Sequence, residues 1–78
     1  MTITDEKDDI FLKIYINKIL HLKINFNYIE YIHSYIDDNN IRKDIYKIEI
    51  SFKNKESILL LEYENKITWI KILKILNY

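Results

Sequence analysis

The sequence contains no cysteine, no glycine and no proline among its 78 residues. The lack of cysteine excludes disulfide bonds and thiolate metal sites. The lack of glycine excludes phosphate-binding loops and dinucleotide-binding fingerprints in their usual form. Alanine and valine are also absent, and they share GC-rich codons with glycine and proline, which indicates an AT-rich genome. The abundance of Ile, Lys, Asn and Tyr is therefore weak evidence for any particular ligand.

Targeting and membrane signals are missing as well. The first nine residues, MTITDEKDD, are polar and acidic, whereas a secretory signal begins with a basic region followed by an apolar one. No uninterrupted apolar run approaches the 18 or so residues that a membrane-spanning helix needs. Together with the lack of cysteine, these features predict a protein of the cytoplasm, either of a cell or of an infected host.

What remains is a chain rich in large apolar side chains. Hydrophobic residues make up 49% of it, aromatic residues make up 14%, and the formal net charge is zero. High hydrophobicity with low net charge argues against disorder, and zero net charge argues against a protein dominated by phosphate binding. We expect one folded domain over residues 10–78, preceded by an acidic arm over residues 1–9 that its composition allows to be disordered.

Apolar and polar residues alternate with period two in four segments, which predicts four strands. The predicted strands are residues 10–16, 20–26, 45–52 and 58–64. Between the first two lie Asn17 and Lys18, a spacing that suits a tight hairpin with asparagine at positive φ. Residues 53–57 are predicted to form the turn between the last two strands.

Two segments carry helical spacing instead. In residues 28–37 and 66–77 the apolar positions recur at i, i+3, i+4 and i+7. Asn27 and Asn65 precede these segments as N-cap residues. The sequence therefore predicts an α+β fold with the order ββαββα, in which two helices cover one face of a four-stranded antiparallel sheet.

An alternative makes residues 5–20 a helix. Thr4 would be its N-cap, and the acidic first turn would suit the helix dipole. The resulting order of elements is similar to a winged helix. We disfavour this alternative because the segment between Asn39 and Asp44 offers no room for a recognition helix.

Catalytic and metal-binding patterns are weak. The two histidines are His21 and His33, and Glu30 with His33 forms one Glu-x-x-His pair on the polar side of the predicted helix. Di-metal carboxylate sites need a second such pair facing the same interior. Ser34 and Ser51 have no partner constellation for nucleophilic catalysis. We expect no enzymatic activity, no metal, no cofactor and no small-molecule substrate.

The uncovered face of the predicted sheet is the strongest candidate for a contact surface. It mixes lysines with aromatic and aliphatic side chains: Phe11, Lys13, Tyr15, His21, Lys23, Lys47, Lys53, Ile58 and Leu60. The leading hypothesis is a small non-enzymatic module that binds another protein or a second copy through this face or an edge strand. Inhibitors, immunity proteins and viral or phage accessory proteins have this character, by analogy.

A nucleic-acid regulator is the alternative hypothesis. It would use Lys13, Lys23, Lys47 and Lys53 with neighbouring aromatic rings to hold single-stranded nucleic acid. An ordinary half-exposed sheet face, shaped by codon usage alone, would have the same composition.

Overall fold

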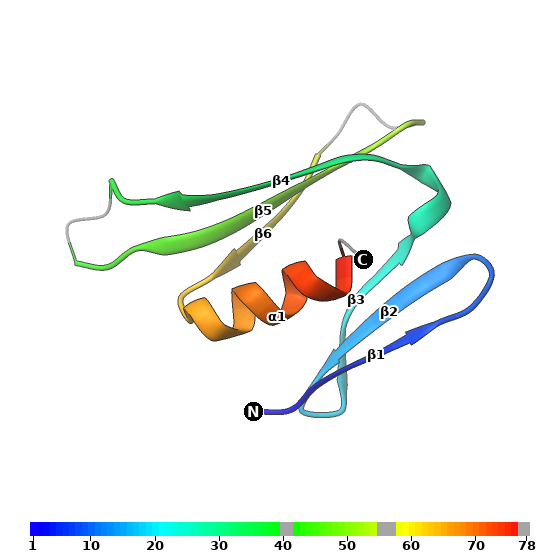
Figure 1. Cartoon of the computed structure of the whole chain (residues 1–78), viewed down its shortest axis with the longest axis horizontal. Coiled ribbons are helices and arrows are strands. Elements are labelled where there is room, and N and C mark those ends of the chain that lie inside the picture. The colour runs from blue at the N-terminus through cyan, green and yellow to red at the C-terminus, as the bar shows by residue number, and fades with distance from the viewer. Residues whose placement is uncertain (40–41, 55–57, 77–78) are drawn as a thin grey trace.

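Six strands and one α-helix make up the part of the chain that this computed structural model describes, which is residues 1–39, 42–54 and 58–76 (Figure 1). A single 3₁₀ turn, Phe26–Tyr28, joins the two halves of the chain. The elements are β1 (Ile3–Lys7), β2 (Phe11–Ile16), β3 (Ile19–Asn25), β4 (Ile29–Asp37), β5 (Ile45–Phe52), β6 (Ile58–Tyr63) and α1 (Lys66–Leu76).

The strands form two three-stranded antiparallel sheets, with the orders β1-β2-β3 and β4-β5-β6. The prediction of one four-stranded sheet with two helices is therefore wrong. The prediction differs from the structure in two elements: it lacks strand β1, and it makes a helix of the segment that forms β4. The disfavoured alternative, a helix over residues 5–20, is also wrong, because these residues form β2 and parts of β1 and β3.

The hairpin between β2 and β3 follows the sequence prediction. Asn17 and Lys18 both have positive φ, at 52° and 68°. Asn17 also fixes the start of the chain, because its N–H donates to the Thr2 carbonyl at 2.8 Å and its Oδ1 accepts from the Thr2 N–H at 3.0 Å. The apolar residues predicted to face inward on these strands include Leu12 and Ile14, which are buried.

The second turn residue offers a test of this hairpin. Lysine in the left-handed region is disfavoured by about 1 kcal/mol relative to glycine, because its Cβ crowds the backbone. We expect Lys18→Gly to raise the free energy of unfolding by about 0.5–1 kcal/mol in urea denaturation. The control Lys13→Gly, in the middle of β2, should lower it. A destabilised Lys18→Gly protein would contradict the observed turn geometry.

The acidic segment at the start of the chain contains β1. Its five residues pair with β2 from Ile3 opposite Ile16 to Lys7 opposite Leu12. Apart from Ile3, the strand is exposed along its length. The pairing with β2, rather than an apolar pattern of its own, holds this segment in the sheet.

The segment 28–37, predicted as a helix, is strand β4. A β-bulge between Ile29 and Tyr31 explains the misleading spacing, because it leaves Glu30 as an extra residue opposite β5. Inward-facing positions then resume at Ile32, so a spacing of two becomes a spacing of three. That change imitates the i, i+3 pattern of a helix, although tyrosine and isoleucine favour strands.

Asn27 has a different role from the predicted helix cap. Its backbone N–H donates to Oδ1 of Asn25 at 3.0 Å, which closes the 3₁₀ turn. Its side-chain amide donates to the carbonyl of Asp9 at 3.2 Å. Asn27 therefore ties the connection between the sheets to the loop before β2.

The last three elements agree with the sequence prediction. In β5, Ile48 and Ile50 face inward, and in β6 Tyr63 does so at the strand's end. The side chain of Asn65 caps α1 as predicted, with Oδ1 accepting from two backbone N–H groups of the first turn at 2.8 and 3.1 Å. Of the predicted turn over 53–57, residues 53–54 form a turn and residues 55–57 lie outside the described residues.

Helix α1 lies between the two sheets (Figure 1). It contacts β1 of the first sheet and β5 and β6 of the second. Residues from all three layers form one core: Leu12, Ile14, Leu22, Ile24, Ile48, Ile50, Tyr63, Ile72 and Leu76. Burial of each such side chain contributes about 1.5–3 kcal/mol to stability. Because α1 packs between the sheets, it covers the apolar inner faces of both.

Candidate binding surface

The outer face of the β4–β6 sheet is the side that points away from α1. The strand registers place eleven residues on it: Tyr31, His33, Tyr35, Asp37, Ile45, Lys47, Glu49, Ser51, Ile58, Leu60 and Glu62. In Figure 1 the helix and the other sheet both lie on the opposite side of this sheet. Within the described residues no helix or strand covers this outer face.

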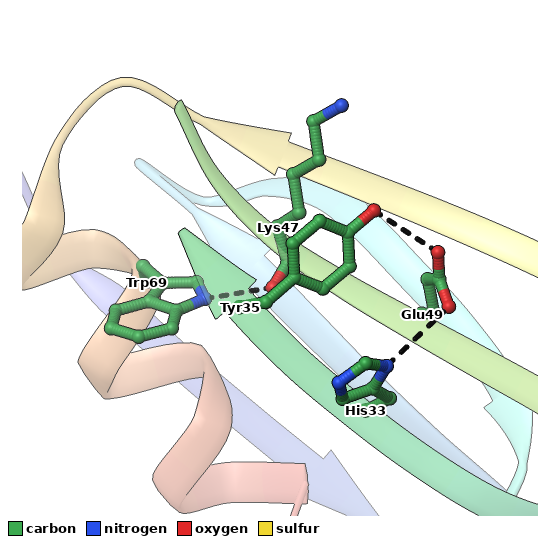
Figure 2. Close-up of polar contacts among 5 residues, drawn as sticks. All are labelled: His33, Tyr35, Lys47, Glu49 and Trp69. Carbon is green, nitrogen blue, oxygen red and sulfur yellow. Dashed lines mark hydrogen bonds and ion pairs between the residues drawn. The ribbon is translucent and has the colours of Figure 1, made fainter. Parts of the chain in front are cut away.

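Half of the outer face is a hydrogen-bonded polar group centred on Glu49 (Figure 2). The Tyr35 hydroxyl donates to Oε1 of Glu49 at 3.0 Å, and Nδ1 of His33 lies 3.8 Å from Oε2 of the same carboxylate. The His33 and Tyr35 rings are 5.2 Å apart between centroids. Burial, followed by the hydrogen bond to Glu49, raises the pKa of Tyr35. The cluster therefore presents a fixed carboxylate flanked by two rings.

Lys47 continues this polar group along the strands. Its ammonium lies 3.1 Å from Oδ2 of Asp37, and this hydrogen bond raises the pKa of Lys47. The pKa of Asp37 is lowered, first by the hydrogen bond from the Asn39 backbone N–H and then by Lys47. On the opposite side of β5, the Trp69 indole N–H donates to the Lys47 carbonyl at 3.1 Å (Figure 2). Strand and helix together hold this lysine in place.

The other half of the outer face is apolar. Tyr31, Ser51 and Ile58 lie in one row across the three strands, and Leu60 lies in the next row. Tyr31, Ile58 and Leu60 each keep more than two fifths of their surface in water. Ser51 is buried between them and donates to Oε2 of Glu30 at 3.4 Å. An apolar patch therefore borders the fixed polar group on one continuous face.

The nine residues predicted for a single face are divided by the structure. Lys47, Ile58 and Leu60 lie on the outer face just described, and Lys53 lies in the turn after β5. Four others lie on the outer face of the first sheet: Phe11, Lys13, Tyr15 and Lys23.

His21 is the extra residue of a bulge between β2 and β3, since Tyr15 pairs with Leu20 and Ile14 pairs with Leu22. Its Nε2 lies 2.7 Å from the Tyr63 hydroxyl, across the junction of the two sheets. His21 is exposed, so it has a partner in the second sheet and still contributes to the molecular surface at this junction.

On the outer face of the first sheet, the contacts involve Phe11 and the two lysines Lys13 and Lys23. The Lys23 ammonium lies 4.4 Å from the centre of the Phe11 ring, in a cation–π contact that covers the ring. Lys13 pairs with Lys23 on one side and with Glu6 on the other. Two lysines directly opposite each other repel, so the charge of Glu6 is needed beside them.

Sequence reasoning missed three members of the polar and apolar groups: Tyr31, His33 and Tyr35. All three lie on β4, where the predicted helix placed them on different sides. The period-two series of aromatic and imidazole side chains at 31, 33 and 35 is the signal that indicates a shared face.

A hollow of about 460 Å³ lies where the two sheets meet at one end. Its lining is mostly apolar: Phe11, Lys23, Ile24, Asn25, Tyr28, Phe52, Asn54 and Leu59. Among the described residues there is no group of three or more histidine, aspartate or glutamate side chains placed to hold a metal ion. The same residues contain no helix of the length and apolar character that spanning a membrane requires.

Comparison with known proteins gives no further assignment. No protein-family model, no curated protein and no solved structure matches this chain. The outer face of the β4–β6 sheet and the edges of that sheet are therefore the features that indicate a function.

Proposed function

We propose that this chain is a small non-enzymatic protein-binding module that acts through the outer face of the β4–β6 sheet. The observation that carries the proposal is the apolar patch of Tyr31, Ile58 and Leu60 beside the polar group around Glu49. Interfaces commonly combine an apolar centre containing tyrosine with a polar rim. This face carries both kinds of surface, an apolar patch that contains Tyr31 and a polar group that borders it.

Preorganisation supports the same proposal. The Tyr35 hydroxyl is already bonded to Glu49, and Lys47 is already paired with Asp37. Side chains that are fixed before binding lose less conformational entropy when a partner arrives. Tyr31 adds a large surface that has few rotatable bonds. The face therefore offers area and polar groups at a low entropic cost.

The charges of the outer face favour a protein partner over nucleic acid. Lys47 is paired with an acidic side chain, and Glu49 and Glu62 lie nearby on the same face. Of the four lysines of the nucleic-acid hypothesis, only Lys13 and Lys23 share a face, where Phe11 and Tyr15 accompany them. Two lysines are a small footprint for a phosphate backbone. The following experiment therefore also tests for nucleic-acid binding.

The experiment compares two identical substitutions on different sheets. Leu60→Glu places a charge in the apolar patch, and Leu20→Glu places the same charge on the outer face of the first sheet. Both leucines are about half exposed, at 43% and 50%, so both variants should fold. Tagged proteins would be incubated with lysate of the producing cells, with and without nuclease, and each captured protein would then be titrated.

We expect Leu60→Glu to weaken binding of the captured partner by at least about tenfold, which corresponds to 1.4 kcal/mol. Leu20→Glu should bind as the unmodified chain does. Loss of the partner with Leu20→Glu but not with Leu60→Glu would place the contact on the other sheet. Capture that disappears after nuclease treatment and falls steeply with salt would instead support nucleic-acid binding.

A further inference from the structure

Strand β4 has an open edge. It is the longest strand, with nine residues from Ile29 to Asp37, and it lies at the end of its sheet. One side pairs with β5 along the whole strand. On the other side, none of the strands in residues 1–39, 42–54 and 58–76 pairs with it. Along an antiparallel strand, successive residues direct their N–H and C=O groups alternately to one neighbouring strand and to the other. The groups that β4 directs away from β5 are therefore unpaired at this edge.

The other three sheet edges are protected in ways that β4 is not. Strand β1 carries three consecutive charged residues, 5–7, and contacts α1. The edges of β3 and β6 lie near each other, since His21 is hydrogen-bonded to Tyr63 and Ile24 lines the same hollow as Leu59. Natural sheets use charge, proline, bulges or covering elements to prevent such edges from pairing.

Strand β4 has few of these devices. Its sequence, IEYIHSYID, contains no lysine, arginine or proline. Glu30 is displaced into the bulge at the start, and Asp37 is paired with Lys47 at the end. Between them, residues 31–37 run in regular register without a further bulge. The open edge therefore offers seven residues in the geometry that a further strand requires.

We propose that β4 pairs antiparallel with β4 of a second copy of this chain, about a two-fold axis at Ser34. The two β4–β6 sheets then join into one continuous six-stranded sheet. This interface uses the edge of β4, whereas the binding module described above uses the outer face. The two outer faces become neighbours on a single surface, and a partner can bind to both.

The side chains of β4 are self-complementary in this register. On the inner side, Ile32 of one copy lies opposite Ile36 of the second, and Ile36 is 45% exposed in the single chain. On the outer side, Tyr31 lies opposite the second copy's Asp37, and His33 lies opposite its Tyr35. Apolar pairs and aromatic–polar pairs of this kind stabilise antiparallel sheets, and residues 31–37 place no like charges opposite each other.

A slip of one residue toward the start of β4 is less favourable. It places the axis at His33, so that the two imidazoles face each other and Ile32 faces Ser34 of the second copy. Both pairs are poorer than the His33–Tyr35 and Ile32–Ile36 pairs of the register centred on Ser34.

Sedimentation equilibrium over a range of concentrations tests the association. The unmodified chain should form dimers, and Ile36→Lys should weaken dimerisation at least about tenfold, because lysine on an edge strand opposes pairing. The control Ile58→Lys changes an isoleucine of similar exposure on the outer face and should leave the dimer intact. Circular dichroism would show that each variant is folded. A monomer at every concentration, or equal weakening by both variants, would overturn the proposal.

Oxidative cross-linking tests the register. Because the chain has no cysteine, Ser34→Cys introduces a single thiol. Opposed residues in antiparallel strands have Cα atoms about 4.5–5.5 Å apart, which fits a disulfide. We expect rapid cross-linking of Ser34→Cys and slow cross-linking of the control Thr4→Cys on the edge of β1. Equal rates would overturn the register. The outcome is independent of partner capture by the outer face, which the Leu60→Glu comparison measures.

Discussion

Replacing Ile72 with alanine is expected to lower the free energy of unfolding by about 3 kcal/mol. Ile72 is fully buried, and it lies on the helix that separates the two sheets. The truncation leaves a cavity where both sheet faces and the helix meet, so neither sheet can collapse onto the space alone. A domain of this size has a total stability near the lower end of about 5–15 kcal/mol, which makes the loss a large fraction of it.

Ile67→Ala is the matched control for this measurement. It makes the same substitution on the same helix, but Ile67 is 65% exposed. Alanine has the higher helix propensity, so we expect a change within about 0.5 kcal/mol. Both variants would be compared by urea denaturation. Equal effects of the two substitutions would contradict the placement of α1 as the central layer of the core.

Tyr63→Phe is expected to reverse its effect on stability as the pH rises. Burial raises the pKa of Tyr63 from 10.0 to about 12. Near neutral pH, the variant should be less stable by about 1 kcal/mol, because it loses the hydrogen bond with His21. At about pH 12, the variant should be more stable than the unmodified chain by about 1 kcal/mol.

The reversal follows from the direction of the pKa shift. The folded state favours the neutral phenol, so its contribution is fully present below pH 10 and is lost as the pH approaches 12. Two pKa units correspond to about 2.7 kcal/mol, of which about 2 kcal/mol is lost at the folded-state pKa. Phenylalanine has no proton to lose, whereas all other titrating groups are common to both proteins. A stability difference that stays constant with pH would contradict the burial of the Tyr63 hydroxyl.

The sequence predicts those parts of the fold in which side-chain period and local turn chemistry agree. The β2–β3 hairpin has clean alternation around Asn17, and α1 has both an apolar stripe and the cap of Asn65. In these elements the local preference and the tertiary contacts favour the same conformation. Each of them is found within a few residues of its predicted bounds.

The failures occur where tertiary pairing decides the conformation. The sequence of β1 predicts a polar arm, because four of its five residues are exposed and only the pairing with β2 orders it. The sequence of β4 predicts a helix, because the bulge at Glu30 changes the spacing of its inward side chains. A bulge is specified by the partner strand as much as by its own residues, so a single sequence does not reveal it.

The prediction of the candidate surface was affected by two errors of the fold prediction, the helix in place of β4 and the single sheet in place of two. Ile58 and Leu60 face outward because β6 alternates regularly, whereas their role in binding stays a prediction. Their neighbours on β4 were placed on a helix, so the group around Glu49 was not recognised. The same misassignment concealed the open edge of β4, which exists only when this segment is a strand. Two sheets in place of one also separated Phe11 and Lys23 from the rest of the predicted face.

The position of α1 in the chain order has a consequence for synthesis on the ribosome. Both three-stranded sheets connect strands that are neighbours in sequence, so each can form as soon as its own segment is available. Hairpins form in about 1–10 μs, whereas translation proceeds at about 5–20 residues per second. The 13 residues from the end of β6 to the end of α1 therefore take roughly one to three seconds to add. Until α1 has been added, the apolar inner faces of the two sheets lack the helix that covers them both, so the common core is completed only with the last of these elements.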